Sequence, residues 1–461
     1  HTRYIGDWSS DVCSSDLRKN IWSLSWPLII ANFTIPLVGL TDTIIMGHMP
    51  ESTYIAAIAL GGIVFNFMYA GLNFLRMGTT GIVSQKLGSK DFDEVFLSLL
   101  RPLFIALLIG IVLFLSKEFL FNLSVYFLTP DEKLQKLYKE YLFVRMIGLP
   151  AGLLNIVFLG WFFGMQKTRA VMIQLITINV INVICSLYLA VILDYGIFGV
   201  ALGSVLAQFS GLLMSIIIFS YSIKKLNLET LNFKKFKSIS RFLKLFSISK
   251  DLFIRTMLMV AVQAYVIKKA GLIGVDELAT IEILLVIFSL SSYSLDAFAH
   301  SAESCVGVSI GSQNKRNIYK AIRITTEFAL FFSIFIGIIL YLFEFYLISI
   351  FTDISVLRDL TLGLWGLVII TPFISMSAFQ LDGIFIGSTL AKEMRNCIIF
   401  SSLFFFIILE FWFENNLDLK ELYSSFLLFL ISRGVFLTIY LPRVLDRKST
   451  RLNSSHRCIS Y

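Results

Sequence analysis

Long apolar stretches, separated by short polar connections, occupy the chain from residue 20 to residue 446. A bilayer core about 30 Å thick requires roughly 20 mainly apolar residues per helix. Runs such as Leu330–Leu342 show no polar alternation, which argues against the strands of a membrane barrel. Twelve stretches have the required length: 24–46, 53–76, 95–116, 141–164, 170–193, 197–221, 252–273, 278–302, 321–343, 361–387, 396–413 and 422–442. The pattern predicts an all-α polytopic membrane protein with twelve transmembrane helices.

The second half of the chain repeats the organisation of the first. A Gly-Ser pair at 88–89 and another at 311–312 lie 223 residues apart, and each pair follows a hydrophobic segment and precedes a charged loop. Six spans per half is an even number, so both halves enter the membrane from the same side. We therefore expect two six-helix lobes related by a pseudo-two-fold axis along the membrane normal, an arrangement typical of secondary transporters.

The two ends of the chain lack this pattern. Residues 1–17 and 447–461 are rich in Ser, Asp and Arg, have no apolar periodicity and resemble translated sequencing adapters, so we exclude them from the fold prediction. Between them we expect an N-lobe at 20–221 with helices 1 to 6 and a basic cytoplasmic linker at 222–250. The C-lobe, with helices 7 to 12, is expected at 251–446.

Composition and charge agree with a membrane protein and orient it. Hydrophobic residues make up 57% of the chain, above the roughly 45–50% typical of soluble domains. The connections at 48–53, 194–198 and 274–277 contain no Lys or Arg, whereas the alternate connections and the linker are basic. The positive-inside rule then places both termini and the linker in the cytoplasm. We interpret the basic linker as an orientation signal and a surface for anionic membrane lipid, not as a nucleic-acid site.

Several functional classes find no support in the sequence. It contains no Walker A motif, nucleophile elbow or Gly-rich dinucleotide turn, so neither ATP drive nor enzymatic activity is expected. Cys185, Cys305 and Cys397 form no CxxC pair, and a single histidine among acids does not make a metal site. We expect no cofactor and no metal. A channel would need a filter motif, and a membrane-embedded transferase would need a loop dense in acids and histidine.

A carboxylate inside the first apolar span is the strongest candidate for chemistry. Asp42 lies well within that span, and no Lys or Arg occurs between Asn20 and Arg76. Charge in hydrocarbon is costly, and a buried acid without a cationic partner favours its protonated form. Asp42 is therefore predicted to bind a proton near neutral pH; the alternative is a protonated or hydrogen-bonded structural acid near the outer mouth. Pro27 in the same span removes a backbone hydrogen bond and permits a bend.

The fifth span contributes uncharged polar residues. Asn179, Asn182 and Ser186 lie within it, and the last two are four residues apart and so share a helix face. These side chains either line the cavity that Asp42 faces or join neighbouring helices by hydrogen bonds.

A stripe of ionisable residues occurs on the eighth span. Asp296, His300 and Glu303 are spaced by four and three residues, which places them on one side of a helix. Such Asp, Glu and His stripes are typical of proton relays but also occur in structural networks, here with Arg255 or Lys268 as candidate partners. Both interpretations of this C-lobe stripe remain open.

Longer motifs distributed along the chain point to a known family. They are Trp26–Asn32, Gly39–His48, Phe74–Gly81, Leu295–Glu303, Leu381–Gly387 and Glu393–Asn396. With these motifs the sequence resembles the multidrug and toxic compound extrusion (MATE) family, and within it the DinF-like branch. The resemblance implies a cation-coupled antiporter of the bacterial inner membrane, with two six-helix lobes around a central cavity that opens alternately to each side. We expect it to work as a monomer.

The resemblance also implies a set of N-lobe residues. The family's cation network has an Asp on the first helix, an Asn and an Asp four apart on the fifth, and a Thr on the sixth. Asp42 and Asn182 match the first two positions, Ser186 replaces the second acid and Ser204 takes the Thr position. Pro27, fifteen residues before Asp42, matches the bending proline of the first helix. Because Ser186 removes the second carboxylate, a proton is implied as the driving ion in place of sodium.

The expected cargo follows from the expected cavity. An aromatic-rich, acid-poor cavity suits amphipathic or cationic organic compounds. The alternative within the same superfamily is a flippase of lipid-linked precursors, whose members carry more arginines in the cavity.

Overall fold

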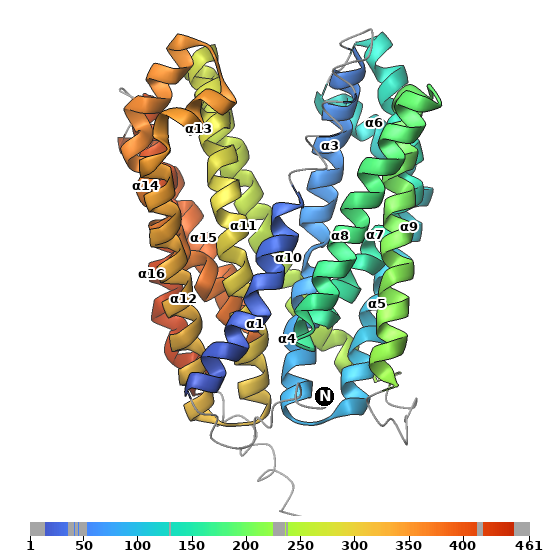
Figure 1. Ribbon diagram of the computed structural model, residues 1–461, viewed down its shortest axis with the longest axis vertical. Coiled ribbons are helices and arrows are strands. Elements are labelled where there is room, and N and C mark those ends of the chain that lie inside the picture. The colour runs from blue at the N-terminus through green and yellow to red at the C-terminus, as the bar shows by residue number, and fades with distance from the viewer. Residues whose placement is uncertain are drawn as a thin grey trace, which may run out of the picture. The chain divides into compact units, whose positions relative to one another are not determined.

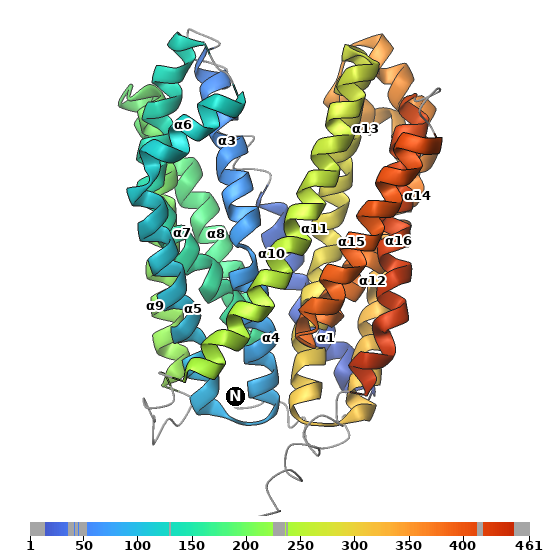
Figure 2. The same ribbon diagram turned by 180° about the vertical axis from the view of Figure 1, so that it is seen from behind.

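The computed structural model describes residues 14–35, 41, 45, 53–128, 131–224, 236, 238–412 and 418–446, and within these residues every regular element is a helix (Figures 1 and 2). The first half contains α1 (Ser14–Phe33), α3 (Thr53–Leu72), α4 (Phe74–Gly88), α5 (Phe92–Leu115), α6 (Lys117–Leu128), α7 (Glu132–Gly164), α8 (Thr168–Leu187), η1 (Tyr188–Ile192) and α9 (Gly196–Ile223). The second half contains α10 (Ile239–Ile273), α11 (Val275–Gly311), α12 (Lys315–Leu342), α13 (Glu344–Phe351), α14 (Ser355–Gly387), α15 (Ala391–Ile407), η3 (Ile408–Trp412) and α16 (Leu419–Leu445).

The helices confirm the predicted all-α membrane class. Among the described residues, nine helical segments are long and apolar enough to cross a bilayer. Several helices extend past the predicted spans; α10, for example, begins at Ile239, well before the apolar stretch at 252–273. Apolar composition marks only the part of a helix that lies in hydrocarbon, so polar helical ends outside it are missed. α1 also begins early, at Ser14, and its Leu17 is fully buried.

The described contacts divide the chain into two compact units. The N-terminal unit comprises residues 26–86 and 91–245, and α7 lies at its centre, packed against α3, α5 and α9. α8 packs against α9 and also contacts α7 (Figure 1). Inside this unit the Trp161 indole donates a hydrogen bond of 3.1 Å to the Val95 carbonyl oxygen, which joins α7 to α5. A buried indole with its N–H satisfied contributes packing without an unpaired donor.

The C-terminal unit comprises residues 246–446, the turn at 87–90 and the start of α1 up to Ser25. Here α14 holds the central position, packed against α11, α12 and α16, and α15 packs against α16. The Trp365 indole donates a 3.0 Å hydrogen bond to the Leu340 carbonyl oxygen, and this bond joins α14 to α12. The start of α1 is held by ring stacking of Trp22 on Phe328, with centroids 6.0 Å apart.

Backbone contacts repeat between the two units. In each unit two glycines of the central helix lie against backbone carbonyl oxygens of a neighbouring helix, and each contact in the second unit falls 223 residues after its counterpart: Gly160 against Arg76, Gly164 against Thr80, Gly383 against Ala299, and Gly387 against Glu303. A Cβ added at Gly160 would lie 2.5 Å from the Arg76 carbonyl oxygen, so only glycine allows this approach. α8 and α15 also share a feature, since each ends in a π-helical turn. The offset seen in the sequence therefore extends to close packing.

Candidate functional site

Neutral amides join three helices inside the N-terminal unit. Gln174 of α8 donates to the backbone oxygen of Asn155 of α7 at 3.1 Å and to its side-chain oxygen at 3.2 Å. The Asn155 amide in turn donates to the Gln208 carbonyl oxygen of α9 at 2.8 Å and to its side-chain oxygen at 3.1 Å. Asn155 and Gln174 are almost fully buried. Sequence reasoning did not single out Asn155 and Gln208, although an amide within an apolar span is itself a signal of such a contact.

Of the predicted N-lobe residues that the structure describes, two bond to each other, one bonds to a residue outside the set and one has no described partner. Asn182 of α8 donates to the Ser204 hydroxyl of α9 at 3.0 Å, and Asn179 donates to the Thr34 hydroxyl at 2.5 Å. The Asn182 side-chain oxygen is buried and accepts no hydrogen bond from a described residue. Ser186 is fully buried, and its hydroxyl likewise has no partner in the described part of the chain. The structure thus brings Asn182 and Ser204 together and leaves Ser186 outside the pair.

The predicted coupling residue, Asp42, lies outside the described residues. Within the described part of the N-terminal unit, Glu94 is the one buried carboxylate. Its carboxylate forms ion pairs with Arg101 at 3.2 Å and with Arg241, so both of its partners are arginines. Among the described residues, no buried acid other than Glu94 lies in the N-terminal unit, and Glu94 is not bonded to Asn182. Pro27 lies inside α1, two residues after the point at which the chain passes from the C-terminal unit to the N-terminal unit.

The residues of the C-lobe stripe lie on α11 but have different partners. His300 Nδ1 is 3.2 Å from Glu303 Oε2, and the Glu303 side chain is completely buried. Asp296, about one helical turn earlier, interacts electrostatically with Arg433 of α16. Between them, the Ser301 hydroxyl shares a 2.7 Å hydrogen bond with Ser25 of α1. No group of His, Cys, Asp and Glu among the described residues could hold a metal ion.

An ionic cluster that sequence reasoning did not anticipate lies beside this stripe. One oxygen of Asp382, Oδ2, accepts hydrogen bonds from Arg255 of α10 and from Arg433 of α16, the latter at 2.6 Å. Asp382, Arg255 and Arg433 are 6%, 6% and 2% exposed. Arg255, considered above as a partner of the stripe, thus pairs with Asp382. The sequence signal was Arg433 itself, an arginine in the middle of the predicted span 422–442. Two buried cations thus share one hydrogen-bonded carboxylate, and Asp296 adds a negative charge near Arg433.

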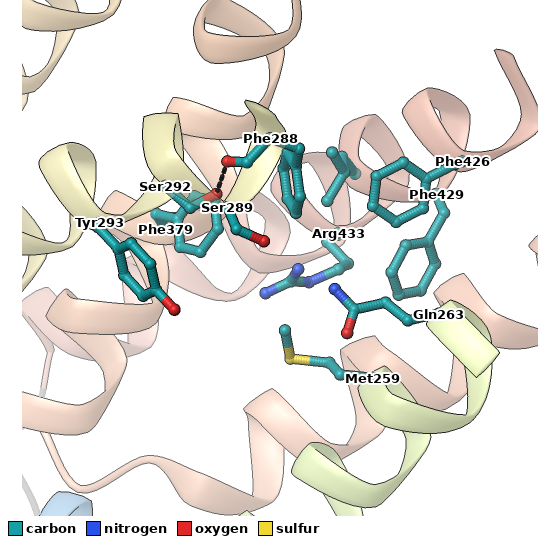
Figure 3. A pocket seen from close by; sticks show the side chains of 11 residues that line it. Met259, Gln263, Phe288, Ser289, Ser292, Tyr293, Phe379, Phe426, Phe429 and Arg433 are labelled. Atoms are coloured by element: carbon teal, nitrogen blue, oxygen red, sulfur yellow. Dashed lines mark hydrogen bonds between the residues drawn. The ribbon is translucent and has the colours of Figure 1, made fainter. Parts of the chain in front are cut away.

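A pocket of about 160 Å³ opens beside this cluster within the C-terminal unit. Figure 3 shows the Arg433 guanidinium and the Gln263 amide directed into the same space, with phenyl rings around them. The lining consists of Met259, Gln263, Phe288, Ser289, Ser292, Tyr293, Phe379, Phe426, Phe429, Leu430 and Arg433. The walls carry four phenylalanines and a tyrosine, and the one charged residue among the lining residues is an arginine.

Comparisons with known proteins agree with the motifs. A profile of the MatE family matches residues 27–188 and 252–412. The chain is 28% identical to DNA damage-inducible protein F of Escherichia coli (strain K12), over 92% of this chain and 91% of that protein. It is 24% identical to a probable multidrug resistance protein NorM of Bacillus cereus, over 73% of this chain and 75% of that protein.

Solved structures share the fold. A MATE in the straight conformation superposes with a TM-score of 0.86 at 17% identity, covering 97% of this chain and 100% of that one. The Vibrio cholerae MATE transporter VcmN in the bent form superposes with a TM-score of 0.83 at 15% identity, covering 94% of this chain and 98% of that one. These likenesses confirm the predicted twelve-helix, two-lobe architecture, and the similarity to DNA damage-inducible protein F agrees with the predicted branch.

Proposed function

Because the chain belongs to the MatE family of multi-pass membrane transporters, we propose that it exports amphipathic or cationic organic compounds in exchange for protons, by alternating access. The observation that carries this proposal is the hydrogen-bonded pair of Asn182 and Ser204. It is buried inside the N-terminal unit, and no described carboxylate lies with it. A neutral polar site of this kind suits a single carboxylate that changes its protonation state.

Asp42 is the residue that we propose to bind the proton. When protonated, a carboxylic acid is neutral and gains one O–H donor. The buried Asn182 side-chain oxygen, which accepts no hydrogen bond from a described residue, is a suitable acceptor for such a donor. When deprotonated, the acid has no donor to offer and carries a charge that is costly in an apolar interior. Binding and release of the proton would therefore favour different arrangements of the first helix.

A proton is preferred over sodium because Ser186 replaces an acid. Its hydroxyl is buried next to Gly203, where an added Cβ would lie 2.6 Å from the Ser186 oxygen, so α8 and α9 are in close contact there. A sodium ion desolvated at this place would have Asp42 as its only charged ligand from the predicted network. A single proton requires no further charge.

Pro27 is proposed to let the first helix bend during the cycle. α1 is held within the C-terminal unit up to Ser25, whose hydroxyl bonds with Ser301 at 2.7 Å. Proline in a helix interior removes one hydrogen bond and favours a kink. The residues after Pro27 belong to the N-terminal unit, so a bend there would let them respond to protonation while the start of α1 stays in place.

We further propose that the protein resides in the bacterial inner membrane as a monomer with both termini in the cytoplasm. The basic linker at 222–250 supports this orientation by the positive-inside rule and would meet anionic lipid there. The alternative function, a flippase of lipid-linked precursors, is favoured by one observation: Arg433 lines the pocket of the C-terminal unit.

Transport by purified protein in proteoliposomes tests the proposal. Efflux of the cationic dye ethidium should respond to an imposed pH gradient and remain the same when sodium replaces potassium at equal ionic strength. Sodium-dependent efflux at fixed pH would contradict proton coupling. Movement of a fluorescent lipid-linked sugar without dye efflux would favour the flippase.

A further inference from the structure

We infer that the pocket of the C-terminal unit binds a small organic anion: a carboxylate, sulfonate or phosphate group attached to an apolar ring. The inference deepens the proposed function, on which it rests, because it adds a charge class to the compounds that the transporter accepts. It comes from the charge, the free donors, the walls and the size of the pocket, all formed by one unit.

The charge of the cluster favours an anion. Arg255 and Arg433 both bond to a single oxygen of Asp382, so two positive groups share one negative group. Guanidinium groups stay protonated in proteins, and a buried charge is stable only when it is paired. Asp296 interacts electrostatically with Arg433 but does not line the pocket. A ligand anion in the pocket would supply a second direct partner for the two arginines.

Donors at the pocket wall can bind such an anion. Arg433 uses Nη2 for Asp382, and its guanidinium makes no other hydrogen bond to a described residue. A guanidinium has five N–H donors in a fixed fork that matches carboxylate, sulfonate or phosphate oxygens. Gln263 of α10 points into the same space and adds a neutral donor (Figure 3). Ser292 already donates to the Phe288 carbonyl oxygen at 2.8 Å and is not needed for this role.

The walls and the volume suit one ring. Phe288, Phe379, Phe426 and Phe429 surround the polar groups. The pocket volume of about 160 Å³ is similar to that of an apolar cavity of about 150 Å³ that holds benzene. The ligand is therefore expected to place one aromatic or comparable ring between the phenyl groups and its acid group against Arg433.

Fluorine NMR of the full-length protein in a neutral maltoside detergent provides the test. The three probes share one ring and differ in charge: 4-fluorobenzenesulfonate, neutral 4-fluorobenzenesulfonamide and cationic 4-fluorobenzylamine. Charge-assisted hydrogen bonds should make the sulfonate bind roughly tenfold more tightly than the other two. Equal affinity for all three probes would overturn the inference.

Four variants assign the effect to the pocket. Arg433→Gln should abolish the preference for sulfonate, and Gln263→Leu should weaken sulfonate binding if Arg433→Gln does not fold. Asp296→Asn should tighten sulfonate binding, because it removes a negative charge that acts on Arg433; a merely structural cluster predicts no gain. Ser432→Ala is the matched control, since Ser432 neighbours Arg433 and donates only to the Phe429 carbonyl oxygen of its own helix, at 2.8 Å. A sulfonate preference that survives both Arg433→Gln and Gln263→Leu would contradict the site.

Two further arms identify the source of the anion and separate this inference from the proposed function. Dihexanoylphosphatidylglycerol should displace the sulfonate, and dihexanoylphosphatidylcholine should not, if a lipid headgroup is the natural source; without displacement the source is a soluble organic anion. Asp42→Asn should bind the sulfonate as the wild type does, because binding requires no gradient. Proton-driven ethidium efflux without sulfonate binding would overturn only the anion site.

Discussion

The two units bury polar groups of different kinds on similar scaffolds. In the N-terminal unit the described contacts around Asn182 and Asn155 join neutral amides and hydroxyls, and the one buried carboxylate among its described residues, Glu94, pairs with Arg101 and Arg241. In the C-terminal unit they join arginines to a carboxylate, Asp382, and a histidine to a buried glutamate. The packing between central and neighbouring helices is nevertheless repeated at the same offset.

Positions next to the repeated glycine contacts show where the units differ. Asp382 directly precedes Gly383, and the residue before Gly160 in the other unit is Leu159. Glu303 lies against its glycine through its carbonyl oxygen, and the equivalent contact in the N-terminal unit is made by Thr80. Main-chain contacts are thus common to both units. Carboxylates at these contacts, Asp382 and Glu303, occur in the C-terminal unit, while the ionisable residue at the N-terminal contacts is Arg76. The repeated scaffold thus holds hydrogen-bonded amides in one unit and an arginine–carboxylate cluster in the other.

The largest effect on transport is expected from changing Asp42, the acid that we propose to bind the proton in the N-terminal unit. Asp42→Asn should abolish proton-driven ethidium efflux in proteoliposomes, because the amide cannot exchange a proton. Expression and elution as a monodisperse species should remain normal, which serves as the control. If the variant kept full efflux with unchanged pH dependence, the assignment of coupling to the N-terminal unit would be wrong.

Glycine substitutions test whether the two scaffolds are equivalent. Gly160→Ala and Gly383→Ala should each lower stability by about 1–3 kcal/mol, because the added Cβ meets a backbone carbonyl oxygen in a packed interface. Gly62→Ala and Gly363→Ala are matched controls, since no heavy atom lies within 4 Å of a Cβ built there. Thermal denaturation followed by size-exclusion fluorescence gives the measurement. A large loss in one unit and none in the other would break the equivalence.

Transport rates of variants in the C-lobe stripe on α11 test whether the C-terminal unit takes part in switching. Single changes Asp296→Asn, His300→Gln and Glu303→Gln should slow transport roughly two- to tenfold, the size expected for losing one hydrogen bond or charge contact. Unlike Asp42→Asn, none should erase transport. Initial rates of dye efflux at saturating pH gradient provide the measurement, with Ser432→Ala as reference. Wild-type rates for all three variants would show that the stripe has no part in switching.

The smallest effect on transport is expected from placing a second acid near Asn182 in the N-terminal unit. Ser186→Asp would give the N-terminal unit a second carboxylate next to Asn182, on the same face of α8. We expect a modest sodium stimulation of efflux at fixed pH that the wild type lacks. Asn179→Asp, about two turns before position 186 on the same helix, is the positional control. Identical sodium responses from both variants would contradict a specific role for position 186.

Much of the fold could be predicted from the sequence, because helices in a bilayer must be about 20 apolar residues long. Family motifs placed Asn182 and Ser204 in one predicted network, and the structure joins these two by a hydrogen bond. The cluster around Asp382 did not, since its partners Arg255 and Arg433 are 127 and 51 residues away in the chain. Apolar composition shows that a span exists but does not show which of its faces meets which helix. Side-chain contacts between distant helices therefore required the three-dimensional structure.

The ion pair between Glu94 and Arg241 bears on any attempt to produce the protein as two fragments. Arg241 lies in the first turn of α10 and pairs with Glu94, which also pairs with Arg101. These three residues belong to the N-terminal unit, whereas α10 continues after Leu245 into the C-terminal unit. A chain cut before Ile239 would place Arg241 on the second fragment. In the first fragment Glu94 would keep Arg101 as a partner and lose Arg241. When the two fragments are co-expressed, the ion pair between Glu94 and Arg241 could form again and help them to associate.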